Sequence, residues 1–184
     1  GLHGLAPEGG DVLWSQPVAS FRGMNILTPS VHENAVFTSA YGGASDLYRI
    51  VKSETGFEVE TAWTNKATAY MSSPVVIDGH AYLHLRNQRL DCIDLATGES
   101  RWRTEGVGTY WSLAYQGDKI LALDQTGELL LVRANHEAFE LLDQRSVSEQ
   151  PTWGHVAVAG DQIFIRELEG LVAYRWRASE AASR

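Results

Sequence analysis

The chain has 184 residues and a net charge of −8, with 15 lysine and arginine against 23 aspartate and glutamate residues, and 44% of it is hydrophobic. This composition suits a globular protein with a sizeable core, and the acidic balance disfavours nucleic acid or an anionic membrane surface as a partner. No apolar run approaches the ~20 residues of a membrane span, and the single cysteine, Cys92, excludes an intrachain disulfide and a cysteine-rich zinc site.

A unit of four short strands repeats along the chain, which begins inside one copy of it. Residues 2–17 match only a third strand, a turn and an outer strand. Three full units are expected at 26–64, 72–104 and 110–144, and a last unit at 153–177 lacks its outer strand. The polar stretch at 178–184 is predicted to be a disordered tail.

The clearest copy is residues 72–103, where alternating apolar strands are separated by Asp78-Gly79 and Thr97-Gly98. Glycine supplies the positive φ that such hairpin turns need. The turn before the second strand recurs at four places, with a period of about 40 residues, which is typical of propeller blades. These turns are Glu33-Asn34, Asp78-Gly79, Gly117-Asp118 and Gly160-Asp161. The sequence therefore predicts an all-β protein built of about four β-propeller blades.

The incomplete first and last units leave three arrangements open. The strand at 11–14 could pair with the strand at 171–174 within one chain, which gives a small four-bladed ring. The same pairing between two copies gives a homodimer with eight blades. The arrangement we expect is that the chain is the C-terminal part of a longer protein, whose other part completes a seven- or eight-bladed ring.

Ligands of propellers bind at the mouth of the central channel, on the loops between blades. The aromatic and polar residues of these loops suit a protein segment or a small ligand. The candidate binding residues are Arg22, Asn25, Tyr70, Arg86, Tyr110, Trp111, Trp153 and His155. The alternative is that they only plug the top of the channel. A second binding mode is offered by the strand edges at either end and by the outer strands, to which a partner could add a strand.

No catalytic motif and no metal site is expected. The nearest histidine pair, His80 and His84, lies on one strand, where a spacing of four residues separates the side chains by about 13 Å. One metal ion cannot bridge that distance. Three tryptophans near the ends of outer strands, Trp14, Trp63 and Trp102, are expected to pack between adjacent blades.

The segment Cys92–Trp102 (CIDLATGESRW) resembles the repeat of the pyrroloquinoline-quinone (PQQ) propeller family, in which an aspartate, a Thr-Gly turn and a docking tryptophan recur. In this reading Asp94 accepts hydrogen bonds from turn N–H groups, Gly98 adopts the conformation of the turn, and Trp102 docks on the neighbouring blade. Weaker copies surround Trp14 and Trp63.

The PQQ-like family contains both enzymes and binding proteins. Its alcohol dehydrogenases are periplasmic and hold the quinone, beside a calcium ion, between a tryptophan and a disulfide of adjacent cysteines, which Cys92 alone cannot form. Its cofactor-free members, related to the B subunit of the outer-membrane barrel assembly machinery, bind proteins. The resemblance therefore implies a periplasmic or otherwise exported bacterial scaffold without a cofactor. The alternative is a fragment of a PQQ-dependent alcohol dehydrogenase with PQQ and calcium.

Overall fold

The structure is a computed structural model that describes residues 1–176, so residue 177 and the tail predicted at 178–184 lie outside the described residues. Each sheet is antiparallel and its strands follow one another in chain order. The first sheet has two strands, β1 (Leu2–Leu5) and β2 (Val12–Gln16). A single 3-10 turn, η1 (Phe21–Gly23), leads to the second sheet.

Three four-stranded sheets form the body of the molecule. The second sheet contains β3 (Ser30–His32), β4 (Ala35–Ser39), β5 (Ser45–Ser53) and β6 (Gly56–Asn65). The third contains β7 (Val75–Ile77), β8 (His80–His84), β9 (Leu90–Asp94) and β10 (Ser100–Arg103). The fourth contains β11 (Ser112–Gln116), β12 (Lys119–Leu123), β13 (Glu128–Arg133) and β14 (Glu140–Ser146). The last sheet has three strands, β15 (Ala157–Ala159), β16 (Gln162–Arg166) and β17 (Leu171–Arg175).

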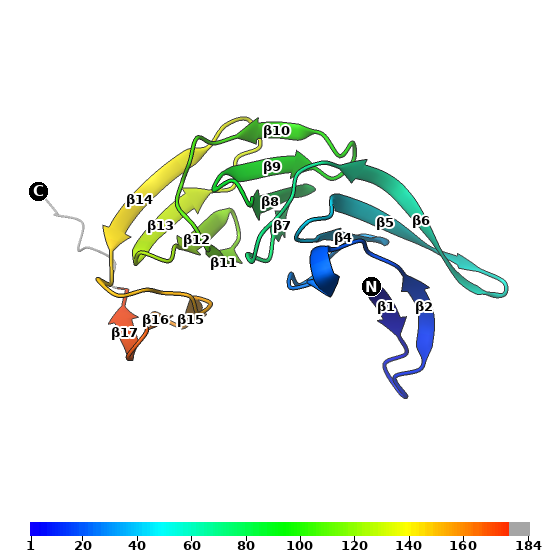
Figure 1. The fold of residues 1–184 in the computed structure, drawn as a ribbon, viewed down its shortest axis with the longest axis horizontal. Coiled ribbons are helices and arrows are strands. Elements are labelled where there is room, and N and C mark those ends of the chain that lie inside the picture. The colour runs from blue at the N-terminus through cyan, green and yellow to red at the C-terminus, as the bar shows by residue number, and fades with distance from the viewer. Residues whose placement is uncertain (177–184) are drawn as a thin grey trace, which may run out of the picture.

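The sheets stand side by side along an arc, with the inner strands on its concave side and the outer strands β6, β10 and β14 on its convex side (Figure 1). The inner strand β7 contacts both of its neighbours, β3 and β11. This is the arrangement of propeller blades, and it confirms the predicted fold class. None of the described residues forms a helix long and apolar enough to cross a lipid bilayer.

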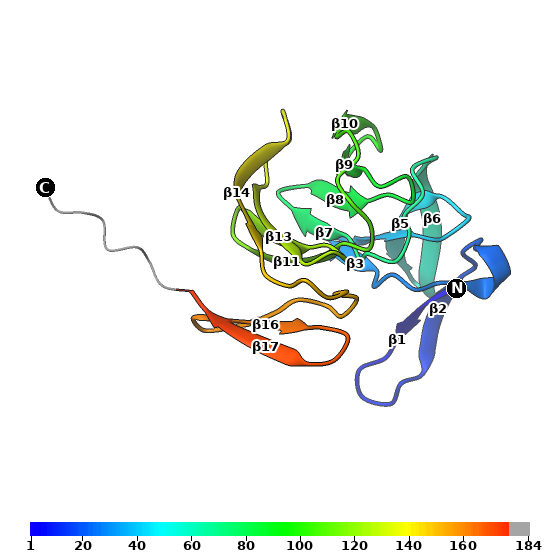
Figure 2. The ribbon, with the colours of Figure 1, turned by 60° about the vertical axis from the view of Figure 1, so that its left-hand side comes forward.

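The first and last sheets lie at the two ends of the arc (Figures 1 and 2). Within residues 1–176, β2 pairs only with β1, and β17 pairs only with β16. The pairing of 11–14 with 171–174 inside one chain is therefore wrong for this structure.

Two strands have bounds that follow from their local sequence and pairing. The inner strand β7 begins directly after Pro74, a residue without a backbone N–H to donate. The outer strand β6 is long because, beyond a bulge at Leu47 and Tyr48, β5 and β6 stay paired down to Ser53 and Gly56. The resulting hairpin extends well beyond the other blades (Figure 1).

The core consists of apolar layers between successive sheets. Phe37 and Leu83 are buried between the second and third sheets, Tyr82 and Ile120 between the third and fourth, and Ile165 between the fourth and the last. Each sheet therefore gains its buried surface from its neighbours, as expected of a repeat protein.

The indoles of Trp63 and Trp102 each connect an outer strand to the following sheet. Trp63 Nε1 donates a hydrogen bond to the carbonyl oxygen of Leu95 at 2.9 Å, and Trp102 Nε1 donates to that of Asn135 at 2.8 Å. Trp14 does not repeat this contact. Its indole instead covers Gly4 of its own sheet, where a Cβ would lie 2.0 Å from Nε1.

The turn between β9 and β10 presents Gly98 to Trp63. Asp94 Oδ1 accepts hydrogen bonds from the backbone N–H groups of Ala96 and Thr97, at 2.8 and 3.4 Å. The turn closes with a 2.7 Å bond from the N–H of Gly98 to the carbonyl of Asp94, and Gly98 has a φ of +78°. The aspartate thus fixes the turn, and the glycine leaves room for the indole of the preceding blade.

Candidate functional site

The loops that enter the inner strands and the loops between second and third strands form one continuous face, which we call the rim. The rim comprises residues 17–29, 40–44, 66–74, 85–89, 104–111, 124–127, 147–156 and 167–170. Backbone hydrogen bonds of 2.7 to 3.1 Å join these loops in sequence: Phe21 to Tyr41, Arg86 to Thr68, Val107 to Gln88, Gln125 to Thr109, and Thr152 to Gln125. Together with the 3.4 Å bond from Thr68 Oγ1 to the carbonyl of Gly43, these bonds connect the loops of the rim from 17–29 to 147–156.

A row of four aromatic rings crosses the first part of the rim. The ring centroids of Phe21 and Tyr41 are 5.8 Å apart, those of Tyr41 and Tyr70 are 5.2 Å apart, and those of Tyr70 and Tyr110 are 5.1 Å apart. The hydroxyls of Tyr70 and Tyr110 share a 3.1 Å hydrogen bond, and this bond is the main cause of the raised pKa of Tyr70. The guanidinium of Arg86 lies 5.2 Å from the centroid of Tyr41.

The row ends in a small pocket of about 290 Å³. Its walls are formed by the loops that precede β7, β11 and β15, and its lining residues are Met71, Tyr110, Trp111, Ser112, Trp153 and His155. Trp153 is 67% exposed. Because Tyr110 belongs to both the aromatic row and the pocket, the two features form one surface, which we call the aromatic rim site.

The structure brings together seven of the eight candidate binding residues. Tyr70 and Tyr110 lie in the row, Arg86 lies over its Tyr41 ring, and the guanidinium of Arg22 lies 5.0 Å from the centroid of its Phe21 ring. Tyr110, Trp111, Trp153 and His155 line the pocket, whereas Asn25 is exposed and does not line it.

Phe21, Tyr41 and Met71 belong to the aromatic rim site but were not among the candidates. They occur in the same loops, and Tyr41 directly precedes the Gly42-Gly43 turn. Its position before this turn, in a loop at the channel mouth, is the sequence feature that could have identified Tyr41 as a site residue.

Trp111 is a core residue and leaves almost no surface for a ligand. It is 1% exposed, its Nε1 donates a 2.8 Å hydrogen bond to the carbonyl of Val107, and its ring stacks on His84 at 5.3 Å. Trp111 therefore closes one wall of the pocket. The aromatic side chains that leave surface in the pocket are Tyr110 and Trp153.

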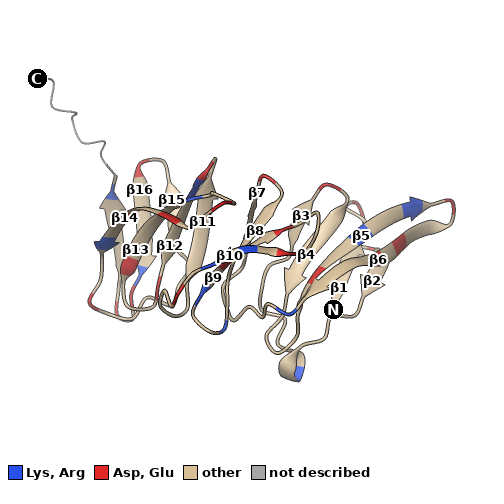
Figure 3. Cartoon of the chain, turned by 90° about the horizontal axis from the view of Figure 1, so that it is seen from above, with Lys and Arg blue, Asp and Glu red and all other residues tan. Residues whose placement is uncertain are grey.

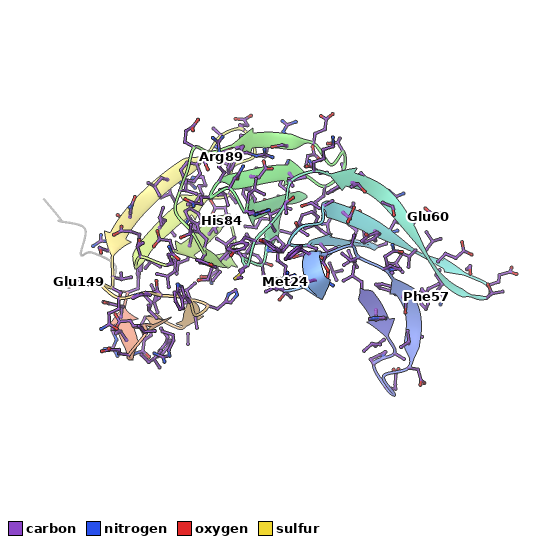
Figure 4. The ribbon with its side chains drawn as sticks, viewed as in Figure 1. Met24, Phe57, Glu60, His84, Arg89 and Glu149 are labelled. Carbon is purple, nitrogen blue, oxygen red and sulfur yellow. The ribbon has the colours of Figure 1, made fainter. Side chains whose placement is uncertain are left out.

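His84 supports this wall from the interior (Figure 4). It is also 1% exposed, and its Nε2 lies 2.9 Å from the carbonyl oxygen of Gly108. A carbonyl only accepts, so Nε2 carries the proton, and Nδ1 has no partner in the described part of the chain. Burial lowers the pKa of His84, opposed by the bond to Gly108 and by the charge of Asp124.

Acid is expected to destabilise the protein through His84. Its pKa in the folded state lies below the ordinary ~6.5 of the unfolded chain, so the unfolded state binds the proton first as the pH falls. The stabilising contribution of neutral His84 is therefore complete above about pH 7 and is lost as the pH falls through its folded pKa. Urea unfolding at several values between about pH 7 and pH 5 measures this slope.

Two variants distinguish the contribution of His84 to the pH dependence of unfolding from the contributions of other titrating groups. His84→Phe, which keeps a ring against Trp111, is expected to unfold with a weaker pH dependence than the wild type. His3→Phe, at an exposed position, is expected to keep the wild-type dependence. If the free energy of unfolding depended equally on pH in all three proteins, His84 would not be the cause of the acid destabilisation.

Neither histidine of the pair His80 and His84 has the other as a neighbour. His80 stacks on His136 at 4.8 Å and hydrogen-bonds the carbonyl of Asp78, whereas His84 faces the core. Across residues 1–176 no group of three histidine, cysteine, aspartate or glutamate side chains is placed to hold a metal ion.

Comparison with known proteins agrees with the propeller fold. The family model of the outer membrane protein assembly factor BamB matches residues 1–104. The crystal structure of BamB from Moraxella catarrhalis is 16% identical and superposes with a TM-score of 0.68 over 93% of this chain and 50% of that one. Searching curated protein sequences gives no match.

Two further solved structures are similar in fold at lower identity. The computationally designed Ika8 protein is 10% identical, with a TM-score of 0.64 over 93% of this chain and 51% of the design. The β-propeller domain of Cps50 (Swd1) from Myceliophteria thermophila is 14% identical, with a TM-score of 0.58 over 78% of this chain and 52% of that domain. The chain thus spans about half the length of these solved structures.

Proposed function

Because the chain belongs to the PQQ-like propeller family of the outer membrane protein assembly factor BamB, we propose that it is a scaffold without catalytic residues that binds a protein segment at the aromatic rim site. We also propose that the protein is exported, as the name of that family suggests. A scaffold of this kind needs a rigid surface with a few aromatic anchors, since such residues supply most of the binding energy at protein interfaces.

The observation that carries the proposal is the continuity of the aromatic row with the pocket through Tyr110. The backbone bonds between the loops hold this surface in place before any partner arrives, which lowers the entropic cost of binding. The pocket has room for one large side chain, and the exposed ring of Trp153 is available to cover it.

The described residues do not fit PQQ and calcium. Cys92 is the only cysteine, so it has no second cysteine with which to form the disulfide that covers the quinone in the enzymes. It is buried in β9, and this burial raises the pKa of its thiol to about 12. The part of the chain that the structure describes also holds no cluster of metal-ligating side chains.

The proposal is tested with a display library of random peptides of about ten residues, selected on the wild-type protein. The selected peptides are expected to lose about 100-fold or more in affinity for the double variant Tyr110→Ala with Trp153→Ala, because two aromatic anchors are worth at least ~1.4 kcal/mol each. Affinity is measured by titration with each synthetic peptide.

The control is Phe57→Ala, at the far end of the β5–β6 hairpin (Figure 4). It removes a partly exposed aromatic ring outside the rim and is expected to leave peptide affinity unchanged. Thermal unfolding of the double variant checks that the fold is intact. Selected peptides that bind the double variant as tightly as the wild type, or a selection without enrichment, would refute the proposal.

A further inference from the structure

The two halves of the rim carry opposite charge. The half formed by residues 17–29, 40–44, 66–74, 85–89 and 104–111 has four basic side chains, Arg22, Lys66, Arg86 and Arg89, and one acidic side chain, Glu105. The half formed by 124–127, 147–156 and 167–170 has four acidic side chains, Asp124, Glu149, Glu167 and Glu169, and no lysine or arginine, although Arg166 ends β16 beside it.

This basic half stands out in a chain whose net charge is −8. The opposite face has a carboxylate at each inner hairpin turn: Glu33, Asp78, Asp118 and Asp161. Asp118 pairs with Lys119 and Arg133, and Asp161 pairs with Arg175, whereas Glu33 and Asp78 have no basic side chain within 4.0 Å among the described residues. Figure 3 shows blue at η1, on the rim edge, and red on turns along the opposite edge. A negatively charged segment is therefore attracted to the basic half of the rim and repelled by the opposite face.

Three of the basic side chains are free to meet a partner. Arg22, Lys66 and Arg86 are exposed, and none has a carboxylate within 4.0 Å in residues 1–176, whereas Arg89 pairs with Glu105 at 3.5 Å. Arg22 and Arg86 each lie over a ring of the aromatic row. The charges of Arg22 and Arg86 thus lie alongside the row, and Lys66 adds a third positive charge on the loop that carries Tyr70.

Backbone strain is concentrated on the same loops. Outside the inner hairpin turns, the non-glycine residues with positive φ among those described are Arg22 at 52°, Gln88 at 64° and Tyr110 at 55°. Such conformations are rare for long or aromatic residues and persist only where the surrounding structure enforces them, often at ligand-binding sites.

We infer that the aromatic rim site selects an extended acidic segment of its partner, whose carboxylates face Arg22, Lys66 and Arg86 and whose apolar side chain enters the pocket beside Trp153. This inference rests on the proposed function and adds the chemistry of the partner. The row of rings, with spacings of 5.1 to 5.8 Å, is crossed by about five residues of extended chain at ~3.3 Å each. The charges come from successive loops, so they match carboxylates spread along a segment.

The test uses three fluorescein-labelled peptides of about ten residues, in which valine alternates with glutamate, glutamine or lysine. At low salt the glutamate peptide is expected to bind about tenfold more tightly than the glutamine peptide, with the lysine peptide weakest. Fluorescence anisotropy measures each affinity. The difference is expected to shrink at about 0.2 M salt because exposed charges are screened.

Variants assign the preference to the rim. Arg22→Gln with Arg86→Gln is expected to remove most of the preference for the glutamate peptide over the glutamine peptide, with Lys66 retaining the remainder. The matched control is Arg49→Gln with Lys52→Gln, which removes two exposed charges from β5, outside the rim, and is expected to change neither affinity.

The outcomes distinguish this inference from the proposed function. The inference of an acidic segment is overturned if the three peptides bind equally, if the lysine peptide is preferred, or if the control pair has the same effect as the rim pair. In each of these cases, binding that still requires Tyr110 and Trp153 keeps the rim as the binding site. Failure of all three peptides to bind, or binding that survives Tyr110→Ala with Trp153→Ala, overturns both.

Discussion

Replacing Trp102 by alanine is expected to lower the free energy of unfolding by about 3 kcal/mol or more, as measured by urea denaturation. The indole fills the space between the third and fourth sheets, with ring centroids 6.0 Å from Tyr82 and 5.9 Å from Phe139. Alanine would leave a cavity there and would also remove the donor to the carbonyl of Asn135. Both losses fall on a contact that joins two blades.

Trp153→Ala is the matched control, because it removes the same side chain from an exposed position. It is expected to change stability by no more than about 0.5 kcal/mol. Trp102→Phe, which keeps an aromatic ring but has no N–H, is expected to fall between the two, at about 1 kcal/mol. If Trp102→Ala and Trp153→Ala were equally mild, the indole of Trp102 would not connect the sheets.

The blades could be predicted from the sequence because their determinants are local. Asp78-Gly79 sets a two-residue turn, and the alternating residues on either side determine which face of each strand is buried. The aspartate and glycine of the β9–β10 turn act within a few residues of each other, so their geometry follows from their spacing.

The rim is harder to predict because its conformation depends on contacts between blades. Trp111 and Tyr110 are neighbours in sequence, yet one is buried against His84 and the other faces the pocket. Aromatic type alone cannot separate them. Tyr110 has a positive φ, which is enforced by the surrounding loops. The sequence does not indicate it, because a tyrosine rather than a typical turn residue occupies the position.

Trp14 shows the same limit in a repeated motif. Its sequence context matches that of Trp102, but its ring covers Gly4 within its own sheet. The next sheet differs at the point where a partner turn would be, because β5 and β6 continue as an extended hairpin. The position of an inter-blade tryptophan therefore depends on both blades, and the sequence around the tryptophan describes only one of them.

The second large effect that we expect is that of Gly98→Ala, because Gly98 packs against the indole of Trp63 in the preceding blade. This substitution is expected to lower the free energy of unfolding by about 2–4 kcal/mol. A Cβ on Gly98 would lie 2.5 Å from Cδ2 of Trp63, whose ring is held in place by its bond to Leu95. Overpacking of this kind typically costs about 1–3 kcal/mol, and the φ of +78° adds about 1 kcal/mol for any residue with a Cβ.

Gly10→Ala isolates the backbone part of this cost. Gly10 has nearly the same φ, +75°, in the turn between β1 and β2, but a Cβ there would have no neighbour within 4 Å. Its replacement is therefore expected to cost only about 1 kcal/mol. The difference between the two variants measures the contact between Gly98 and Trp63.

A double-mutant cycle then assigns that contact to the indole itself. In a Trp63→Ala background the clash has been removed, so Gly98→Ala is expected to cost about as much as Gly10→Ala, and the coupling energy between the two positions is expected to be about 1–3 kcal/mol. If the two substitutions were additive, the turn of one blade would not be shaped by the tryptophan of the blade before it. A measured coupling would instead mean that this glycine is required by an inter-blade contact as well as by its own turn, which explains why aspartate, glycine and tryptophan occur as a set.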